Sequence, residues 1–182
     1  MLSTEADVQR ISAVGILADV GFGCTKLGVG TACASPALVA DGAHSLADVL
    51  VGAASSGAYA AARAPPDEEH PYGHGKIEAG GSLVVGGALV ATGAAAAANA
   101  ATMATAAPDV MTLPAVTACA GVAALSIAGK EWLYRATLRA GERGRSDAIV
   151  ANAHHHRSDA YASIAALGGI VGTYALGVPC SA

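Results

Sequence analysis

The segment Ala153–Asp159 reads Ala-His-His-His-Arg-Ser-Asp and lies inside an otherwise apolar run from residue 148 to residue 176. Ionisable side chains are costly in an apolar environment, so a cluster of them marks a functional site with partners elsewhere in the chain. A second apolar run holds the segment Ala40–Asp48, which reads Ala-Asp-Gly-Ala-His-Ser-Leu-Ala-Asp. Each segment predicts a helix that carries polar groups on one face.

Both segments place a histidine four residues before an aspartate, at His44 and Asp48 and again at His155 and Asp159. Residues i and i+4 share one face of a helix, so each helix presents an imidazole and a carboxylate together. Two such faces supply four ligands, which suits a divalent metal ion in tetrahedral coordination, with Zn2+ first. The alternative is a buried hydrogen-bonded cluster that only fixes helix packing.

The composition indicates an integral membrane protein. The 182 residues are 53% hydrophobic and 13% charged, and the mean hydropathy is +0.48. Soluble domains are more highly charged and less hydrophobic than this. The apolar residues are mostly Ala, Gly and Val, so the helices must rely on close packing with one another. A net charge of -4 leaves no basic stripe, and we predict no nucleic-acid partner.

We predict an all-α fold, a polytopic transmembrane helical bundle with five spans. The spans are expected at about residues 11–31, 36–63, 77–103, 113–133 and 148–176. A hydrophilic loop at 64–76 contains Pro and Gly steps that exclude a continuous helix. A basic connector at 136–146 is expected between the fourth and fifth spans. We interpret Lys130 as part of a cationic belt at the end of the fourth span.

The basic residues predict an orientation. They lie near the N-terminus and around the loops 64–76 and 136–146, so the positive-inside rule places all three on the cytoplasmic side. At 1.5 Å per residue, the two histidine and aspartate pairs lie about 12 to 18 Å from opposite surfaces. His44 is then level with Asp159, and His155 is level with Asp48. In a hydrocarbon core about 30 Å thick the pairs meet near the midplane, where an alternating-access carrier binds its substrate.

Other polar residues in the spans have weaker signals. Asp19 and Lys26 share a face of the first span, where we interpret them first as a pair that orients the helix and second as part of an ion path. Asp41 is expected either to orient the imidazole of His44 through a second-shell hydrogen bond or to face a cavity. Arg157 is expected to pair with a carboxylate.

His154 and His156 flank His155, and adjacent helix positions point about 100° apart. They therefore cannot share the face of His155. We expect them to be second-shell, water-facing or proton-relay residues, with metal ligation as the less favoured alternative.

Four segments occur in a fixed order, at residues 35–48, 67–76, 130–135 and 151–159. Together they resemble the successive signatures of the cation diffusion facilitator family of divalent metal/proton antiporters. The resemblance is greatest to its iron/zinc-type branch, which includes some plant metal tolerance proteins. It implies a homodimer in the lipid bilayer that exports metal from the cytoplasm, with six transmembrane helices and a cytoplasmic C-terminal domain.

The resemblance also implies two sets of metal ligands. The transport site would consist of His44, Asp48, His155 and Asp159, and a cytoplasmic loop site would consist of Asp67, His70 and His74. For the loop, a solvated polar segment without metal is an equal alternative. The chain carries five of the six expected spans and lacks the C-terminal domain, which predicts a truncated product.

Zn2+ is the favoured substrate, with Fe2+, Mn2+, Co2+ and Cd2+ as alternatives. Metal binding requires neutral imidazoles and ionised carboxylates, so protons compete with the ion and are the expected counter-ion. Two other functions are considered. One is a non-transporting remnant that binds metal or dimerises with a full-length relative. The other is an intramembrane metalloenzyme, which is disfavoured because the sequence has no HExxH motif.

Overall fold

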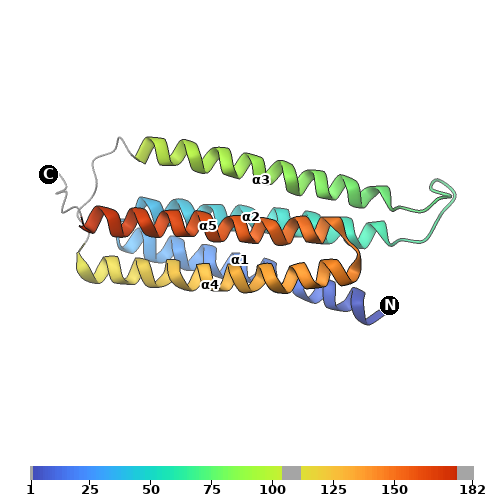
Figure 1. Cartoon of the computed structure of the whole chain (residues 1–182), viewed down its shortest axis with the longest axis horizontal. Coiled ribbons are helices and arrows are strands. Elements are labelled where there is room, and N and C mark those ends of the chain that lie inside the picture. The colour runs from blue at the N-terminus through green and yellow to red at the C-terminus, as the bar shows by residue number, and fades with distance from the viewer. Residues whose placement is uncertain (1, 104–111, 176–182) are drawn as a thin grey trace.

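A computed structural model describes residues 2–103 and 112–175, and these residues form five α-helices without a strand among them (Figure 1). The helices are α1 (Leu2–Ala32), α2 (Pro36–Ala62), α3 (Lys76–Met103), α4 (Leu113–Gly144) and α5 (Asp147–Ala175). The predicted all-α bundle is confirmed. Among the described residues, α1 to α4 each contain a segment long and apolar enough to cross a membrane. Helix α5 has a similar length, but its ionisable residues lower its hydropathy.

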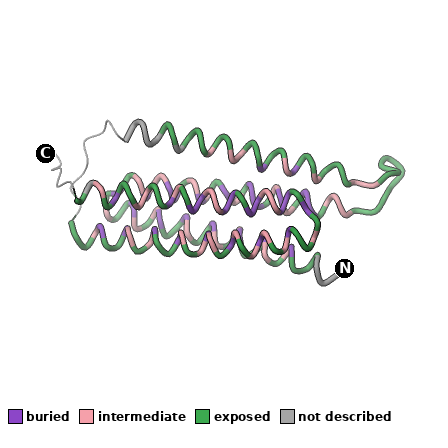
Figure 2. The backbone as a smooth tube through the Cα atoms, in the orientation of Figure 1, coloured by how far each residue is buried: buried purple, intermediate pink, exposed green. Residues whose placement is uncertain are grey.

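Four of the helices surround a common interior. Helix α1 packs on α2 and α4, and α5 packs on the same two helices, so these four close a ring. Helix α3 lies outside the ring, against α2 and α5, and most of its surface is exposed (Figures 1 and 2). Helices α2 and α5 run in opposite directions, which brings the two polar segments identified in the sequence side by side.

A short turn and small residues set the contact between α1 and α2. Ala34 adopts a left-handed conformation with φ of 51°, and the Ser35 hydroxyl caps α2 by accepting a hydrogen bond from the Leu38 amide at 3.4 Å. Farther along, a Cβ atom at Gly42 would lie only 2.9 Å from the backbone nitrogen of Leu27. The two helices therefore approach closely only because position 42 has no side chain.

The prediction of a connecting loop at 136–146 is wrong. Helix α4 continues to Gly144, and only Arg145 and Ser146 separate it from α5. The segment is rich in Ala, Leu, Arg and Glu, which are strong helix formers. Its many basic residues are therefore compatible with a helix and do not indicate a loop. Arg145 takes the left-handed conformation that ends α4, and the Ser146 hydroxyl accepts a hydrogen bond from the Ile149 amide at 3.3 Å to begin α5.

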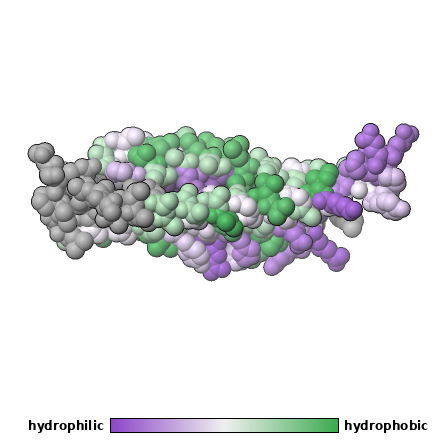
Figure 3. All heavy atoms as spheres, turned by 90° about the horizontal axis from the view of Figure 1, so that it is seen from above, coloured by the Kyte–Doolittle hydropathy of each residue, from purple (hydrophilic) through white to green (hydrophobic). Residues whose placement is uncertain are grey.

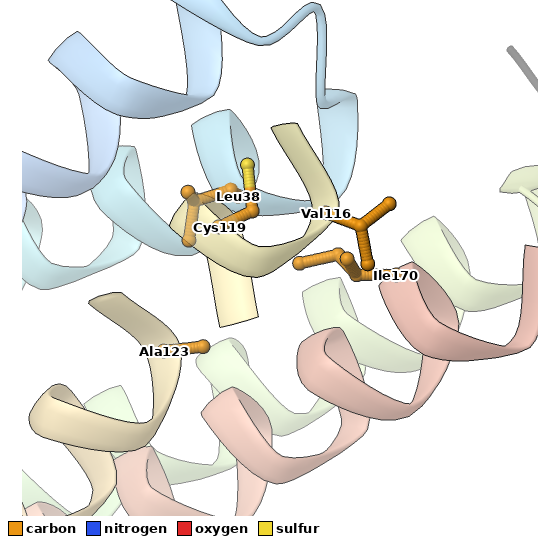
Figure 4. Close-up of a cluster of buried hydrophobic side chains, with 5 residues drawn as sticks. All are labelled: Leu38, Val116, Cys119, Ala123 and Ile170. Carbon is orange, nitrogen blue, oxygen red and sulfur yellow. The ribbon is translucent and has the colours of Figure 1, made fainter. Parts of the chain in front are cut away.

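Two apolar clusters close the bundle at its ends. One consists of Leu38, Val116, Cys119, Ala123 and Ile170, near the turn between α1 and α2 (Figure 4). The other consists of Val8, Tyr59 and Ile149, near the turn between α4 and α5. The face seen in Figure 3 is largely hydrophobic along the middle and hydrophilic at the end that carries the loop between α2 and α3. Between the two clusters the buried residues are mostly polar.

Candidate metal sites

The predicted transport-site residues lie together between α2 and α5. His155 Nε2 is 3.0 Å from Asp48 Oδ1 and 3.7 Å from Asp159 Oδ1. His44 Nε2 is 3.6 Å from Asp159 Oδ1 and 3.9 Å from Asp48 Oδ1. His44 therefore lies beside Asp159, and His155 lies beside Asp48, as the spacing of the two helices predicts. Their role as metal ligands remains a prediction.

The size of this cluster suits a small ion. Ligands of a tetrahedral Zn2+ with bonds of about 2.0 to 2.1 Å lie about 3.3 Å from one another. The ligand atoms of His44, Asp48 and Asp159 all lie within 4.8 Å of one another, whereas His155 approaches the two carboxylates without joining that mutual set. Asp159 Oδ1 is buried and accepts no hydrogen bond from the described part of the chain. A free carboxylate oxygen at this point is available to a cation.

Lys130 lies in the interior of the bundle, so its assignment to a cationic belt at the end of the fourth span is wrong. Its side chain is 0% exposed, not part of an exposed belt, and its ammonium lies 2.6 Å from Asp159 Oδ2, 2.7 Å from Asp19 Oδ1 and 3.3 Å from Asp48 Oδ2. A stripe of buried residues at intervals of three or four continues along α4 past the expected end of the span at Leu133. In the sequence these positions hold small or apolar residues on both sides of Lys130, such as Ala123, Ser126 and Leu133, and this helical periodicity is the signal that could have assigned Lys130 to the interior.

A second buried lysine, Lys26, contacts its own set of polar residues. Lys26 Nζ is 2.9 Å from Asp41 Oδ2 and donates hydrogen bonds to Ser45 and Ser163 at 3.1 Å each. The Ser163 hydroxyl also donates to Asp41. Asp41 therefore pairs with α1 and α5 instead of orienting His44. Asp19 and Lys26 do not pair with each other, because each contacts a charged residue on another helix.

The two histidines that flank His155 in the sequence lie in different surroundings. His156 is buried, with Nδ1 3.9 Å from Asp159 Oδ2, and it packs against α1 at Gly15. His154 is exposed, and its ring lies 5.7 Å from that of Tyr134. The Arg157 guanidinium stacks on Tyr134 and donates to its hydroxyl at 3.1 Å. Within residues 2–103 and 112–175 it has no carboxylate partner, so the expected pairing is wrong.

The predicted loop residues also lie together. Asp67 Oδ1 is 3.2 Å from His70 Nδ1, and Asp67 Oδ2 is 3.3 Å from His74 Nε2. The two imidazole centroids are 4.4 Å apart. Gly73 has φ of 81° and donates its amide to the carbonyl of His70 at 2.9 Å, which turns the chain back on itself. This turn holds one carboxylate and two imidazoles within 4.8 Å of one another.

The loop carboxylate is kept charged by its surroundings. The His70 amide donates a hydrogen bond to Asp67 Oδ1 at 2.6 Å, and this bond lowers the pKa of Asp67 below the ordinary value of 3.8. The two nearby imidazoles lower that pKa further. Asp67 is therefore available as an anionic ligand throughout the physiological pH range.

Comparison with known proteins agrees with the predicted family. A family described as the cation efflux transmembrane domain matches residues 12–180. Metal tolerance protein C1 of Arabidopsis thaliana is 41% identical over 177 residues, which cover 91% of this chain and 38% of that protein. Metal tolerance protein 2 of Oryza sativa subsp. japonica is 38% identical, with 94% of this chain and 50% of that protein covered. No solved structure has a significant match.

A bacterial relative extends the comparison. Manganese efflux system protein MneP of Bacillus subtilis is 32% identical, over 90% of this chain and 54% of that protein. The chain thus spans between 38% and 54% of the length of these three relatives. The family match covers nearly all of the chain. With its helices apolar enough to span a membrane, the chain is a multi-pass integral membrane protein that belongs to the cation efflux transmembrane domain family.

Proposed function

We propose that this chain carries a divalent metal ion through the membrane at the site between α2 and α5. The observation that carries this proposal is the convergence of His44, Asp48, His155 and Asp159 inside a bundle of membrane-length helices. Carboxylates in such an interior are retained for a cation because their burial is otherwise costly. The names of the relatives, metal tolerance and manganese efflux proteins, support a divalent metal as the substrate.

Zn2+ fits two imidazoles and two carboxylates best, and Fe2+, Mn2+, Co2+ and Cd2+ are the further substrates of this proposal. The counter-ion is the proton. A metal ion binds the neutral imidazoles and ionised carboxylates, and protons that occupy the same atoms release it. Because protons and the metal ion compete for the same atoms, a pH difference across the membrane drives the exchange.

The proposed direction is from the cytoplasm outward. Arg63, Lys76 and the basic end of α4 lie at the end of the bundle that carries the loop between α2 and α3 (Figure 1). The positive-inside rule assigns that end to the cytoplasm. Asp67, His70 and His74 then form a cytoplasmic site that binds metal before it enters the bundle. We further propose a homodimer, in which the exposed surface of α3 is available to a second copy.

Flux measured in proteoliposomes tests the proposal. Vesicles that contain this chain alone should accumulate Zn2+ when a pH gradient is imposed, and Asp159→Asn should reduce the rate to that of protein-free vesicles. Asp7→Asn provides the matched control, because it removes the same chemical group from an exposed position of α1 outside both proposed sites and should leave the flux unchanged. Zn2+ binding without flux would support the non-transporting alternative. Equal flux in the wild type and in Asp159→Asn would exclude the site.

A further inference from the structure

Three carboxylates from three helices converge on one ammonium from a fourth. Lys130 on α4 contacts Asp19 on α1, Asp48 on α2 and Asp159 on α5, at 2.7, 3.3 and 2.6 Å. Side chains of all four residues are at most 4% exposed. In such an interior the ammonium offsets part of the charge that the carboxylates place there.

The two carboxylates of the proposed site divide their oxygens between two partners. Asp48 and Asp159 each direct Oδ1 toward the imidazole Nε2 atoms of His44 and His155, at 3.0 to 3.9 Å. Each directs Oδ2 toward the Lys130 ammonium. An ion held by the four residues therefore meets one oxygen from each carboxylate, because the other oxygen is bonded to the lysine.

We infer that Lys130 determines metal specificity by limiting Asp48 and Asp159 to one-oxygen coordination. With both Oδ2 atoms engaged, the site supplies two nitrogens and two oxygens, which is the tetrahedral set that Zn2+ prefers. Without the lysine, both carboxylates are free to bind through two oxygens. The site then supplies up to six ligand atoms, a number that suits octahedral, oxygen-preferring ions such as Mn2+.

This inference rests on the proposed metal site and adds a charge effect to the coordination effect. The ammonium lies on the two carboxylates that bind the ion, so it repels every divalent cation that enters. Its removal should strengthen binding of both ions, and of Mn2+ more than of Zn2+. A residue that only stabilises the fold would not change the ratio of the two affinities.

The chain offers a matched control in its other buried lysine. Lys26 is 1% exposed and is bonded to Asp41, Ser45 and Ser163, and none of these belongs to the proposed ligand set. Lys26→Met therefore removes a buried ammonium from a carboxylate without changing the oxygens of Asp48 and Asp159. Comparison of Lys26→Met with Lys130→Met separates loss of a buried charge from release of the Oδ2 atoms.

The experiment measures dissociation constants of Zn2+ and Mn2+ separately, by equilibrium dialysis of the full chain in lipid nanodiscs. All variants carry His70→Ala and His74→Ala, which remove the loop ligands. In Lys130→Met, we expect Mn2+ to bind at least about tenfold more tightly and the preference for Zn2+ over Mn2+ to fall at least about tenfold. Lys26→Met should keep the preference of the parent chain.

An unchanged preference in Lys130→Met, or weaker Mn2+ binding by a variant that retains its helical circular dichroism, would overturn the inference. If Lys130→Met does not fold, the double variant Asp19→Asn/Lys130→Met removes one charge of each sign and is read in the same way. His155→Ala in the same background distinguishes failure of the proposed metal site from failure of the inference about Lys130. If it leaves binding unchanged, the proposed site itself fails; if it abolishes binding while Lys130→Met leaves the preference unaltered, only the inference about Lys130 fails.

Discussion

The bundle interior and the loop between α2 and α3 use the same side chains in different surroundings. Both bring aspartate carboxylates within 4 Å of two imidazoles. In the interior the carboxylates are at most 4% exposed and share a buried ammonium, whereas Asp67 in the loop is 53% exposed. Water screens the loop carboxylate, whereas the interior carboxylates have little surface in contact with solvent. Burial is thus the reason that one cluster needs Lys130 and the other needs no lysine.

The two regions also obtain their geometry in different ways. The loop is shaped by contacts within a few residues, chiefly the bond from the His70 amide to Asp67 and the left-handed Gly73. The interior depends on residues far apart in the chain, because Asp48 and His155 are separated by 107 positions in the sequence. Local changes should therefore affect the loop cluster alone, and changes in helix packing should affect the interior cluster alone.

The largest expected effect comes from removing the buried ammonium. Lys130→Ala leaves three buried carboxylates without their cation, and breaking a buried pair in this way costs about 3–5 kcal/mol of unfolding free energy. Lys76→Ala, at an exposed lysine beside the loop, should change stability by less than about 0.5 kcal/mol. Equilibrium unfolding in detergent micelles measures both. Equal stabilities would mean that the interior is as well solvated as the loop.

The second effect concerns metal affinity. His155→Ala removes an imidazole that lies near both interior carboxylates, and we expect the interior site to bind Zn2+ more than about 100-fold more weakly, because loss of even an outer-shell partner costs 10–100-fold. His70→Ala should weaken only the loop site. Isothermal titration calorimetry on each variant resolves the two classes of site. A single class lost in both variants would contradict the separation of the two regions.

A third test changes helix packing alone. Gly42→Ala places a methyl group 2.9 Å from the Leu27 backbone nitrogen and forces α1 away from α2, which should cost about 1–3 kcal/mol and weaken the interior site. Gly57→Ala on the same helix meets nothing within 4 Å and should not destabilise the protein. Thermal unfolding with and without Zn2+ distinguishes them. Loop binding should be the same in both, and a change there would show coupling between the regions.

The smallest effect is the response of the loop to pH. Because the folded pKa of Asp67 lies below 3.8, the contribution of its charge to loop order is complete above that value and is lost only as pH falls through the lowered pKa. Between pH 7 and 5 the Asp67 carboxylate should therefore stay ionised. Carbon-13 NMR titration of the Asp67 carboxyl checks this, and a midpoint at or above 3.8 would contradict it.

Much of the fold and part of the site could be predicted because they depend on local patterns. The His44 and Asp48 spacing and its repetition at His155 and Asp159 place each pair on one helix face whatever the rest of the chain does. Because α2 and α5 run in opposite directions, His44 lies level with Asp159 and His155 lies level with Asp48. The observed partners of Asp41 and Arg157 could not be predicted in this way, because they lie on other helices and several residues there were equally possible.

By itself, the sequence determined the all-helical membrane bundle, the two histidine and aspartate pairs, the loop cluster and the family. These follow from hydropathy, turn residues and spacings of a few positions, which act over one or two helical turns. Only the tertiary structure decided where the charges are balanced. Lys130 follows Gly129 and precedes Glu131, a context that is typical of a helix end, yet α4 continues and carries it into the interior. The reason is electrostatic: three carboxylates buried on three helices require a cation, and only packing shows which helix supplies it.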